Sequence, residues 1–385
     1  MPLEEIKHIR DIPIEGKSVF MRLDFNVPIS KDGKVEDDTR IQEALPTIKH
    51  AIERGAKVVM ASHLGRPDGK PSPEFSLEPV AAHLSGLLNM DVTLTDDCVG
   101  EGIELMARGL KGGQVLLLEN LRFHKGEEEN DSEFAHKLSH LCEVYINDAF
   151  GTAHRKHAST YGVPTLMHTK GMGLLIEKEL KFFDRILHHP EPPFYFILGG
   201  AKVSDKIKTV ESLMRKVSGL LIGGAMANAF FAAEGKKIPA NAKQPSPKDI
   251  EAAQHILRDT KKRDIPVLLP VDTIDSFDIG PKTVQEFAHM LQGAKTIFWN
   301  GPLGWFEKPE YSSGTFEMAK AIATLPALKI IGGGDTVSAV KSSGVAESFD
   351  HLSTGGGAAL EYLEGHGLPG IDILKIPVRN QNLPE

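Results

Sequence analysis

Five glycine-rich turns between residues 194 and 360 are the features of this chain best suited to chemistry. Each follows an apolar run and leads towards helix-like sequence: LGGAKVSDK, LLIGGAMAN, WNGPLGWF, IIGGGDTVSAV and HLSTGGGAALEYL. Such a turn directs backbone N–H groups and a positive helix end to one point, which favours an anion, typically phosphate. Glycine is also the usual residue of any tight strand-to-helix connection. Because loops that follow parallel strands share one edge of a sheet, the five together predict a nucleotide site.

No Walker motif accompanies these turns, because GRPDGKP at 65–71 has the wrong spacing and lacks a Ser or Thr after its lysine. In LGGAKVSDKIK, Lys202 and Lys206 are four residues apart, which predicts one helix face near a helix start, where a bound anion would offset their charge. Two solvated lysines would explain the pair equally well. Asp335 follows GGG, where it could be an N-cap, a Mg²⁺ ligand or both.

The first half of the chain carries arginines and histidines instead. KSVFMRLDFNVP alternates, which predicts a strand with one apolar face and one polar face. The polar face carries Arg22, Asp24 and Asn26, and further polar residues follow later apolar runs: His63, Arg66, Arg122, His154 and Arg155. Any one arginine could be an ordinary surface charge. Converging guanidinium groups, however, bind phosphate and carboxylate through paired hydrogen bonds, so the set predicts a pocket for a small, doubly anionic metabolite.

Arg40 lies in the first turn of a predicted helix that Asp37 or Asp38 caps and Gly55 ends. A cation at this position opposes the helix dipole, and a bound anion would explain it.

Composition limits the alternatives. A length of 385 residues predicts two domains, and the net charge of −8 argues against a nucleic-acid or anionic membrane surface as the main partner. The N-terminus has no apolar signal segment, and the longest nearly apolar stretch, 220–233, is too short to cross a bilayer, so we expect a cytoplasmic protein. Cys98 and Cys142 are the only cysteines, and their spacing predicts neither a disulfide framework nor a zinc site.

The region 162–193 separates the two halves. It contains GVPTLMHTKGMG, then the helix-like LLIEKELKFFDRIL, then the HHPEPP breaker. We place the domain boundary near the start of that helix and expect the helix to act as a hinge.

Ten segments, in order along the chain, resemble the phosphoglycerate kinase family over essentially the whole length: RLDFNVP, DDTRI, SHLGRP, LLLENLRFHKGEE, NDAFGTAHR, LGGAKVSDK, DIGPKT, NGPLGWFE, GGGDT and STGGGA. The resemblance implies an α/β protein with two Rossmann-like lobes, each a mainly parallel sheet flanked by helices. It implies a phosphoglycerate-binding lobe at 1–170, an interdomain hinge helix at 171–187 and a nucleotide-binding lobe at 188–367. The tail, about 368–385, would pack back on the first lobe.

The resemblance also implies roles for individual residues. The substrate site would comprise Asp24, Asn26, Arg40, His63, Arg66, Arg122 and Arg155. ATP or ADP would contact Gly200, Lys202, Lys206, Asn300, Glu307, Gly332, Gly333, Gly334, Asp335 and Thr336, with Glu307 on the ribose and Asp335 holding Mg²⁺. The catalytic set would be Arg40, Lys202, Gly333 and Gly356.

The implied reaction is reversible phosphoryl transfer between Mg·ATP and the carboxylate of 3-phosphoglycerate, giving 1,3-bisphosphoglycerate and ADP after the lobes close. We expect a monomer with small-molecule partners only. Two alternatives stay open: a non-catalytic metabolite-sensing relative, and a dinucleotide oxidoreductase, although no G-x-G-x-x-G motif with a following acidic residue supports the latter.

One segment departs from the family pattern, because only TIDSF joins PVD at 270–272 to DIGPKT at 278–283, where family members commonly carry a longer segment. We expect a trimmed surface element there and an altered wall of the adenine pocket, which leaves the nucleotide preference open.

Overall fold

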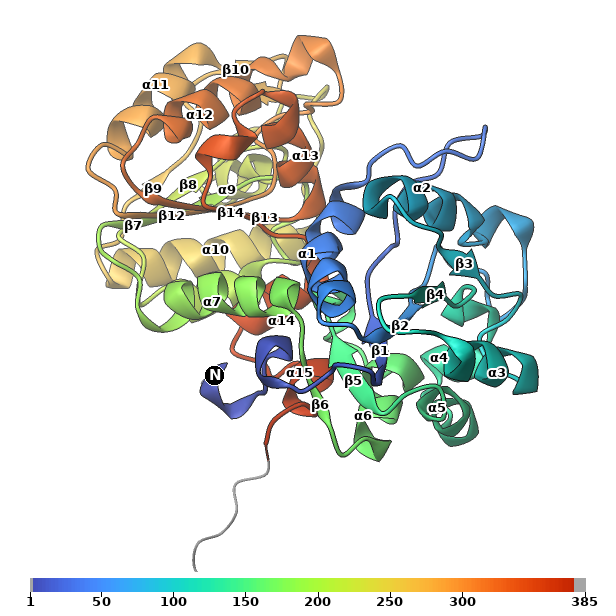
Figure 1. The fold of residues 1–385 in the computed structure, drawn as a ribbon. Helices are drawn as coiled ribbons and strands as arrows, with labels where there is room; N and C mark the ends of the chain where they lie inside the picture. The colour runs from blue at the N-terminus through green and yellow to red at the C-terminus, as the bar shows by residue number, and fades with distance from the viewer. Residues whose placement is uncertain (1–2, 377–385) are drawn as a thin grey trace, which may run out of the picture. The chain divides into compact units, whose positions relative to one another are not determined.

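The computed structural model describes residues 3–376, which divide into two compact units (Figure 1). Unit 1 runs to Lys181 and resumes at Gly367, and unit 2 runs from Phe182 to His366. Helix α7 (Leu174–His188) contains the point of division. The part of the predicted C-terminal tail beyond residue 376 lies outside the described residues, and the predicted domain boundaries stay predictions.

Unit 1 is built on a six-stranded parallel sheet with the order β3-β4-β2-β1-β5-β6. Its strands are β1 (Ser18–Arg22), β2 (Lys57–Ala61), β3 (Thr93–Leu94), β4 (Val115–Leu117), β5 (Val144–Asn147) and β6 (Lys170–Met172). The first strand is central, and the chain adds strands on one side of it before it reverses to the other. Such a reversal opens a crevice at the carboxyl ends of the two central strands, here β1 and β5.

The helices of unit 1 cover both faces of this sheet. They are α1 (Thr39–Glu53), α2 (Glu78–Leu88), α3 (Glu101–Gly109), α4 (Lys125–Glu128), α5 (Ser132–Ser139), α6 (Val163–Leu166) and α15 (Pro369–Asp372). On one face, the buried side chains of α1 and α2 form a continuous core with alternate residues of the strands, including Met21, Met60 and Ile146. On the other face, Tyr145 stacks on Phe20 and donates a 2.8 Å hydrogen bond to the carbonyl of Ser159 in the π-helical turn η6 (Ala158–Gly162).

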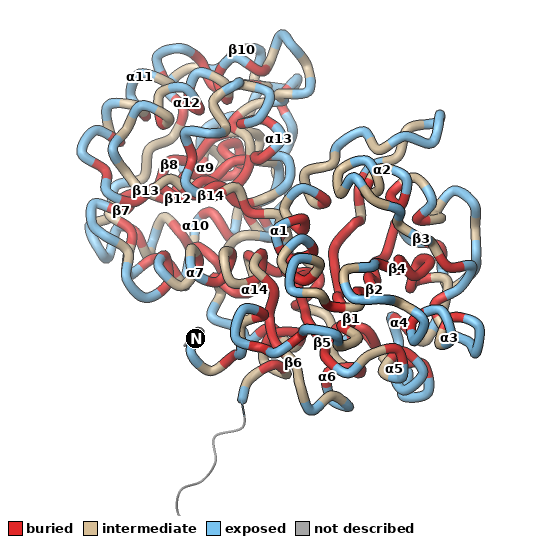
Figure 2. The backbone as a smooth tube through the Cα atoms, viewed as in Figure 1, coloured by how far each residue is buried: buried red, intermediate tan, exposed pale blue. Residues whose placement is uncertain are grey.

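Unit 2 repeats the plan, with the sheet order β14-β13-β12-β7-β8-β9 and every pairing parallel. The strands are β7 (Phe194–Leu198), β8 (Gly219–Ile222), β9 (Val267–Leu268), β12 (Thr296–Asn300), β13 (Leu328–Gly332) and β14 (His351–Leu352). The chain again begins at the centre and reverses once, here between β7 and β12. All strands are short, and their burial is nearly complete at the centre (Figure 2).

Seven helices lie wholly in unit 2: α8 (Ile207–Leu213), α9 (Ala227–Ala233), α10 (Pro247–Lys262), α11 (Pro281–Met290), α12 (Ser313–Ala323), α13 (Gly334–Ser342) and α14 (Gly357–Leu363). The first face of the sheet packs against α11, α12 and α13 through a core that includes Trp299, Phe287 and Met318. The opposite face packs against α7 and α14, where the Phe183 ring meets Phe298 and Tyr362. Helices on both faces of two parallel sheets confirm the predicted α/β fold class.

Buried polar groups in unit 1 hold the start of α7. The Asp148 carboxylate at the end of β5 accepts hydrogen bonds from the backbone N–H groups of Leu175 and Ile176, at 2.9 and 3.1 Å, and the Thr47 hydroxyl accepts one from Leu174. These bonds satisfy N–H groups that no helical carbonyl can reach. Burial raises the pKa of Asp148 to about 7.

The described part of the C-terminal segment returns to unit 1. The backbone N–H of Gly370 donates to the carbonyl of Ala153 at 2.8 Å, and the Asn147 side chain donates to the carbonyl of Gly370 at 2.9 Å. Beyond α15, the backbone N–H of Ile376 donates to the carbonyl of Glu5 at 2.8 Å. The first and last described segments of the chain are therefore hydrogen-bonded to each other.

The strand predicted over 17–28 is shorter than expected, because β1 ends at Arg22. The neighbouring strand β2 ends at Ala61, whose carbonyl accepts a hydrogen bond from the backbone N–H of Leu23. Beyond this point the chain bonds to side chains instead of a strand: the backbone N–H of Phe25 donates to the Ser62 hydroxyl. The predicted apolar alternation is nevertheless correct, since Leu23 and Phe25 are buried in the core. No helix within residues 3–376 combines the length and apolarity that a membrane crossing requires.

Candidate active site

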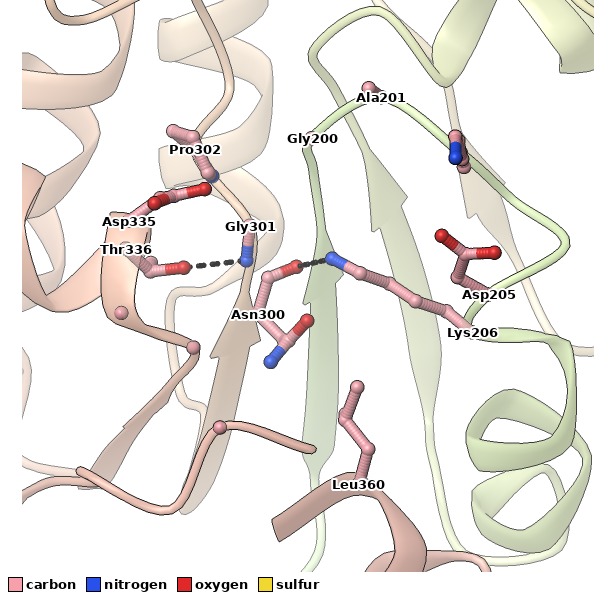
Figure 3. A pocket seen from close by; sticks show the side chains of 14 residues that line it. Gly200, Ala201, Asp205, Lys206, Asn300, Gly301, Pro302, Asp335, Thr336 and Leu360 are labelled. Atoms are coloured by element: carbon pink, nitrogen blue, oxygen red, sulfur yellow. Dashed lines mark hydrogen bonds between the residues drawn. The ribbon is translucent and has the colours of Figure 1, made fainter. Parts of the chain in front are cut away.

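Unit 2 contains a pocket of about 380 Å³ at the point where its sheet reverses (Figure 3). Glycine-rich turns after β7, β12, β13 and β14 line it, and the glycines concerned are Gly200, Gly301, Gly333, Gly334 and Gly356. The turn after β8 is at the same sheet edge but is absent from the lining. The remaining lining residues are Ala201, Lys202, Asp205, Lys206, Asn300, Pro302, Asp335, Thr336 and Leu360.

The turn glycines divide into two groups. A Cβ atom on Gly199 would lie 2.2 Å from the carbonyl oxygen of Pro302, and one on Gly301 would lie 2.2 Å from the carbonyl oxygen of Gly199. These glycines allow the turns after β7 and β12 to touch. A Cβ atom on Gly334 or Gly356 would meet nothing within 4 Å. The second group therefore leaves bare backbone facing open space, as the anion-site prediction requires, whereas the first group has a packing role.

Lys206 connects the turns that follow β7 and β12. Its ammonium group donates to the carbonyl of Asn300 at 2.8 Å (Figure 3) and to the carbonyl of Gly199 at 2.9 Å. Burial lowers its pKa to about 8, and the carboxylates of Asp335 and Asp205 partly oppose that shift. The lysine thus adds a partly buried positive charge to the pocket, while two of the hydrogen bonds that its ammonium group can donate are already made within the protein.

The prediction that Lys202 and Lys206 share one face of a helix was wrong. Helix α8 begins at Ile207, so Lys206 is its N-cap residue and Lys202 lies exposed in the preceding loop. The turn that starts at Gly200, where φ is +86°, takes these residues before helical geometry is reached. Lys202 still lines the pocket.

The alternative in which Asp335 is an N-cap is also wrong, because Gly333 is the N-cap of α13 and Asp335 is exposed in the first helical turn. Thr336, one residue on, is buried, and its hydroxyl accepts a 2.7 Å hydrogen bond from the backbone N–H of Gly301. This bond ties the turn after β12 to the start of α13. Gly332 ends β13, and Glu307 is exposed in the long loop after β12, outside the pocket lining.

Unit 1 holds the second group of predicted residues, and its centre is an ion pair. Arg40, in the first turn of α1, pairs with the buried carboxylate of Asp24 at 2.5 Å. Burial alone would raise the pKa of Asp24, but the charges of Arg40 and Arg22 and a hydrogen bond from the backbone N–H of Asn26 outweigh it and lower the pKa. The cation in the helix start therefore has a partner within the protein, in addition to any anion that binds.

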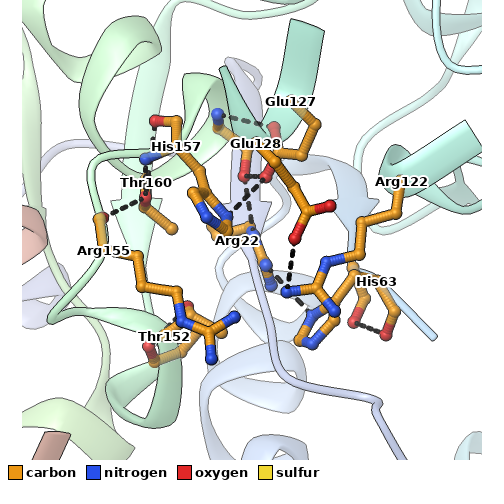
Figure 4. A network of polar contacts seen from close by, with 12 residues as sticks. Arg22, His63, Arg122, Glu127, Glu128, Thr152, Arg155, His157 and Thr160 are labelled. Atoms are coloured by element: carbon orange, nitrogen blue, oxygen red, sulfur yellow. Dashed lines mark hydrogen bonds and ion pairs between the residues drawn. The ribbon is translucent and has the colours of Figure 1, made fainter. Parts of the chain in front are cut away.

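His63 and Arg22 lie behind this pair. The Arg22 side chain is fully buried, donates to the Ser159 hydroxyl at 2.8 Å and meets Nδ1 of His63 at 3.2 Å (Figure 4). Arginine can only donate, so Nδ1 of His63 is the acceptor and its proton is on Nε2. Burial lowers the pKa of His63 well below its ordinary value. The histidine is consequently a neutral hydrogen-bond donor at pH 7.

Arg122 is buried as well. It donates to the carbonyl of Gly65 at 2.7 Å and pairs with Glu128 at 3.2 Å, while its buried Nε atom has no partner. Figure 4 shows the side chains of Arg122 and Arg155 extending towards the same region. Burial lowers the pKa of Arg122, and the positive charge of Arg155 lowers it further. Two guanidinium groups held close together favour an anion between them.

The other predicted residues border the same loops. The Asn26 side-chain oxygen accepts from the backbone N–H of Gly65 at 2.9 Å, and Arg66 follows in the same loop with an exposed side chain. Direct bonds thus join Asp24 to Arg40, and both Asn26 and Arg122 to the loop at Gly65. Arg155 donates from Nε to Nε2 of its neighbour His154 at 3.2 Å, and Arg66 is exposed in its loop.

Sequence analysis missed several residues that shape these sites. Glu127 is fully buried and accepts from the backbone and hydroxyl of Ser159, at 2.9 and 2.5 Å, and thereby holds the group that Arg22 contacts. Asp205 and Leu360 line the pocket of unit 2. Glu127 lies in the quoted segment LLLENLRFHKGEE, but its fully buried position could not be read from three consecutive glutamates. Leu360 has the sequence signature of an ordinary core residue.

The shortened segment forms a tight hairpin in unit 2. Strands β10 (Thr273–Ile274) and β11 (Asp278–Ile279) pair antiparallel, and Asp275 and Ser276 turn between them at φ +49° and +67°. Two residues with positive φ are typical of the type I′ turn that suits twisted strands. The ring of Phe277 contacts Trp305 and Tyr311, at centroid distances of 5.9 and 5.0 Å. How this hairpin affects nucleotide preference stays a prediction.

Comparisons with known proteins agree with the family resemblance seen in the sequence. A sequence model of the phosphoglycerate kinase family matches residues 9–366. The chain is 47% identical over 395 residues to a phosphoglycerate kinase of Anaeromyxobacter sp. (strain Fw109-5), covering 96% of this chain and 99% of the relative. It is 48% identical to that of Acidobacterium capsulatum over 398 residues, covering 95% and 98%. Among solved structures, the phosphoglycerate kinase of Coxiella burnetii superposes with a TM-score of 0.84 at 38% identity, covering 96% of this chain and 98% of that one.

Proposed function

The chain belongs to the phosphoglycerate kinase family, and from this premise we propose that it transfers a phosphoryl group reversibly between ATP and 3-phosphoglycerate. A carboxylate oxygen of 3-phosphoglycerate attacks the terminal phosphorus of ATP, the bond to the bridging oxygen breaks, and ADP leaves. The product is 1,3-bisphosphoglycerate. The observation that carries the proposal is the pocket of unit 2, where four glycine-rich turns meet at the reversal of a parallel sheet.

We assign the nucleotide to this pocket. The bare backbone at Gly334 and Gly356, together with the starts of α13 and α14, supports binding of phosphate oxygens. Lys202 and Lys206 supply positive charge, and Asn300, Gly200, Gly332, Gly333 and Thr336 complete the proposed contacts. The position of Glu307 outside the lining leaves its proposed ribose contact supported by the family resemblance alone.

The residues present fit Mg²⁺ bound together with the nucleotide. Mg²⁺ in such sites takes one or two carboxylates plus phosphate oxygens and waters, and Asp335 offers an exposed carboxylate at the pocket while Asp205 offers a second. Asp335 would hold the ion. When bound, Mg²⁺ supplies neutralisation of the phosphate charge.

We assign 3-phosphoglycerate to unit 1. The unpartnered Nε of Arg122, the neutral Nε2–H of His63 and the exposed guanidinium of Arg66 are donors available to an anion. Arg155, Arg40, Asp24 and Asn26 complete the proposed set. Because the carboxylate of 3-phosphoglycerate is already ionised at pH 7, the reaction needs no general base.

Catalysis then depends on positioning and charge. Lys202, Arg40 and the backbone N–H groups at Gly333 and Gly356 are the groups we propose to stabilise the charge on the transferred phosphoryl group. Donor and acceptor sites belong to separate units, so we propose a closing movement that brings them together and excludes water, with residues 171–187 as the hinge. We further propose a cytoplasmic monomer that has neither nucleic-acid nor membrane partners, in keeping with the net charge of −8.

The test is ADP release by purified protein given Mg·ATP, with and without 3-phosphoglycerate. We expect release that requires 3-phosphoglycerate, falls strongly in Lys202→Ala and persists in Lys208→Ala, which removes an exposed lysine of α8 that does not line the pocket. Folded protein that binds both ligands without releasing ADP would indicate a metabolite sensor. Tight NADH binding without ATP binding would indicate an oxidoreductase.

A further inference from the structure

A second group of chemically active side chains lies in unit 1, outside the residues proposed for phosphoglycerate. Asp97, Cys98 and His124 each direct one ligand atom to a common point, and these atoms all lie within 4.8 Å of one another. Asp97 and Cys98 are adjacent in the loop before α3, and His124 lies between the turn after β4 and α4. Since the histidine is 26 positions further along the chain, the sequence spacing did not predict the cluster.

The three side chains are held in place. The Asp97 carboxylate accepts from the backbone N–H of Cys98 at 2.6 Å and lies 2.5 Å from Nε2 of His124. The His124 ring stacks on Phe134, with centroids 4.7 Å apart and planes 22° apart. The thiol of Cys98 is buried and donates to the carbonyl of Glu119 at 3.0 Å. Ligand groups fixed by such neighbouring contacts lose little freedom when they bind a metal.

The surroundings also favour a cation and give it access. Burial raises the pKa of the Cys98 thiol, and the neighbouring carboxylates of Asp97, Glu127 and Glu119 raise it further, so the local potential is negative. His124 lines an open pocket of about 310 Å³ whose charged lining residues are three carboxylates, Glu129, Asp131 and Glu133, and two lysines, Lys125 and Lys137. Asp97 is half exposed. A hydrated cation can therefore reach two of the three groups from solvent.

The combination of one sulfur, one imidazole nitrogen and one carboxylate oxygen indicates which metal suits the group. Mg²⁺ and Ca²⁺ prefer oxygen ligands only, whereas Zn²⁺ takes sulfur, nitrogen and oxygen in a tetrahedron. In such a tetrahedron ligand atoms lie roughly 3.5 Å apart, given bonds of about 2.0–2.3 Å. Movements of about 1 Å by the Asp97 side chain and the His124 ring would close the separations of up to 4.8 Å and open the 2.5 Å contact between Asp97 and His124.

We propose that Asp97, Cys98 and His124 form a Zn²⁺ site with water as the fourth ligand. On binding, the thiol proton passes to solvent, the hydrogen bond from sulfur to the Glu119 carbonyl breaks, and a bond from sulfur to zinc replaces it. The hydrogen bond between Nε2 of His124 and the Asp97 carboxylate also breaks, the ring proton moves to Nδ1 through solvent, and the freed Nε2 lone pair and a carboxylate oxygen bind the metal. Nothing is oxidised or reduced.

Titration of the untagged full-length protein with Co²⁺, followed by displacement with Zn²⁺, tests this site. Cobalt bound to a thiolate gives a charge-transfer absorption in the near ultraviolet and visible bands typical of tetrahedral coordination. We expect one equivalent of metal with both features, and loss of both when Zn²⁺ is added. Excess Mg²⁺ should not displace the cobalt, because a Mg²⁺ ion selects against sulfur.

Variants distinguish the site from adventitious binding. His124→Asn and Asp97→Asn change exposed or half-exposed side chains and should each weaken Zn²⁺ binding at least about tenfold. Cys98→Ser should abolish the thiolate absorption, and Cys142→Ser, which changes the other cysteine, should leave it intact. The proposal is overturned if Co²⁺ gives no thiolate band, or if the band depends on Cys142. It is also overturned if His124→Asn and Asp97→Asn, shown to be folded by circular dichroism, bind Zn²⁺ like the wild type.

Discussion

The two units share one sheet plan but form their proposed anion sites from different groups. In unit 1 the positive charge comes from side chains: Arg22 and Arg122 are buried, and Glu127, Glu128 and Ser159 must satisfy them. In unit 2 five of the fourteen lining residues are glycines, and the two lysines of the lining are Lys202, which is exposed, and Lys206, which is partly buried. Burying charge is costly unless every group is paired, whereas bare backbone at a glycine needs no such support.

This difference between the two units predicts which substitutions should impair each site. A site of buried cations depends on residues distant in sequence, so single substitutions should affect both ligand binding and folding. A backbone site depends on local turn geometry, so most of its side chains can change without loss of fold. The following predictions test that contrast, from the largest expected effect to the smallest.

Lys202→Ala should lower kcat by about two to three orders of magnitude, since the exposed lysine can act on charge that develops only in the transition state. The dissociation constant of 3-phosphoglycerate, measured by calorimetry, should stay within about twofold, and thermal stability should be unchanged. Lys208→Ala is the matched control. Wild-type turnover in Lys202→Ala would remove this lysine from the mechanism and leave the backbone as the main catalytic element.

Arg66→Ala and Arg122→Ala separate binding from folding in unit 1. Each should weaken 3-phosphoglycerate binding by about 10- to 100-fold, because each removes a charged hydrogen-bond donor. Arg66 is exposed, so its loss should leave the midpoint of thermal unfolding unchanged. Arg122 holds Gly65 and Glu128, so its loss should also lower stability by about 1–3 kcal/mol. Equal stability of the two variants would contradict the view that this site doubles as structural support.

Gly199→Ala and Gly334→Ala make the corresponding comparison in unit 2. The new methyl group at residue 199 would clash with the Pro302 carbonyl at 2.2 Å, which should lower stability by about 1–3 kcal/mol. At residue 334 the methyl group meets open space inside a helix, so stability should stay equal or rise slightly. ATP affinity should fall in Gly334→Ala, because the methyl group occupies the proposed phosphate position. Unchanged ATP affinity in that variant would show that phosphate does not approach this backbone.

The pH dependence of binding should differ between the units. Lys206 has a pKa near 8 in the free protein, and bound phosphate should raise it, so nucleotide binding takes up a proton above pH 8. ATP affinity should therefore fall by up to about tenfold per pH unit above pH 8. Binding of 3-phosphoglycerate should not change over this range, since its site relies on arginines. ATP affinity that stays constant to pH 9.5 would show that phosphate does not reach Lys206.

This contrast also explains how far the sequence could predict the structure. The glycine-rich turns could be recognised because each is a local pattern, and helices on both faces of parallel sheets follow from the alternation of apolar runs and helices. The convergence of Arg122 with the loop at Gly65 is a contact across 57 positions, which no local pattern contains. Lys202 and Lys206 were misplaced because the Gly199–Gly200 turn delays the helix start. The cluster of Asp97, Cys98 and His124 was missed because it too joins residues that are far apart along the chain.

The return of the chain to unit 1 has a consequence for biosynthesis. Gly370 bonds to Asn147 and Ala153, and residue 376 bonds to Glu5, so unit 1 is complete only when almost the entire chain has been made. Unit 2, from Phe182 to His366, is by contrast one continuous stretch inserted within unit 1. During translation the later unit can therefore finish folding first, while the earlier one waits for its last helix. A chain released at residue 366 would contain every residue of unit 2, whereas the bonds of residues 370 and 376 to unit 1 would be missing.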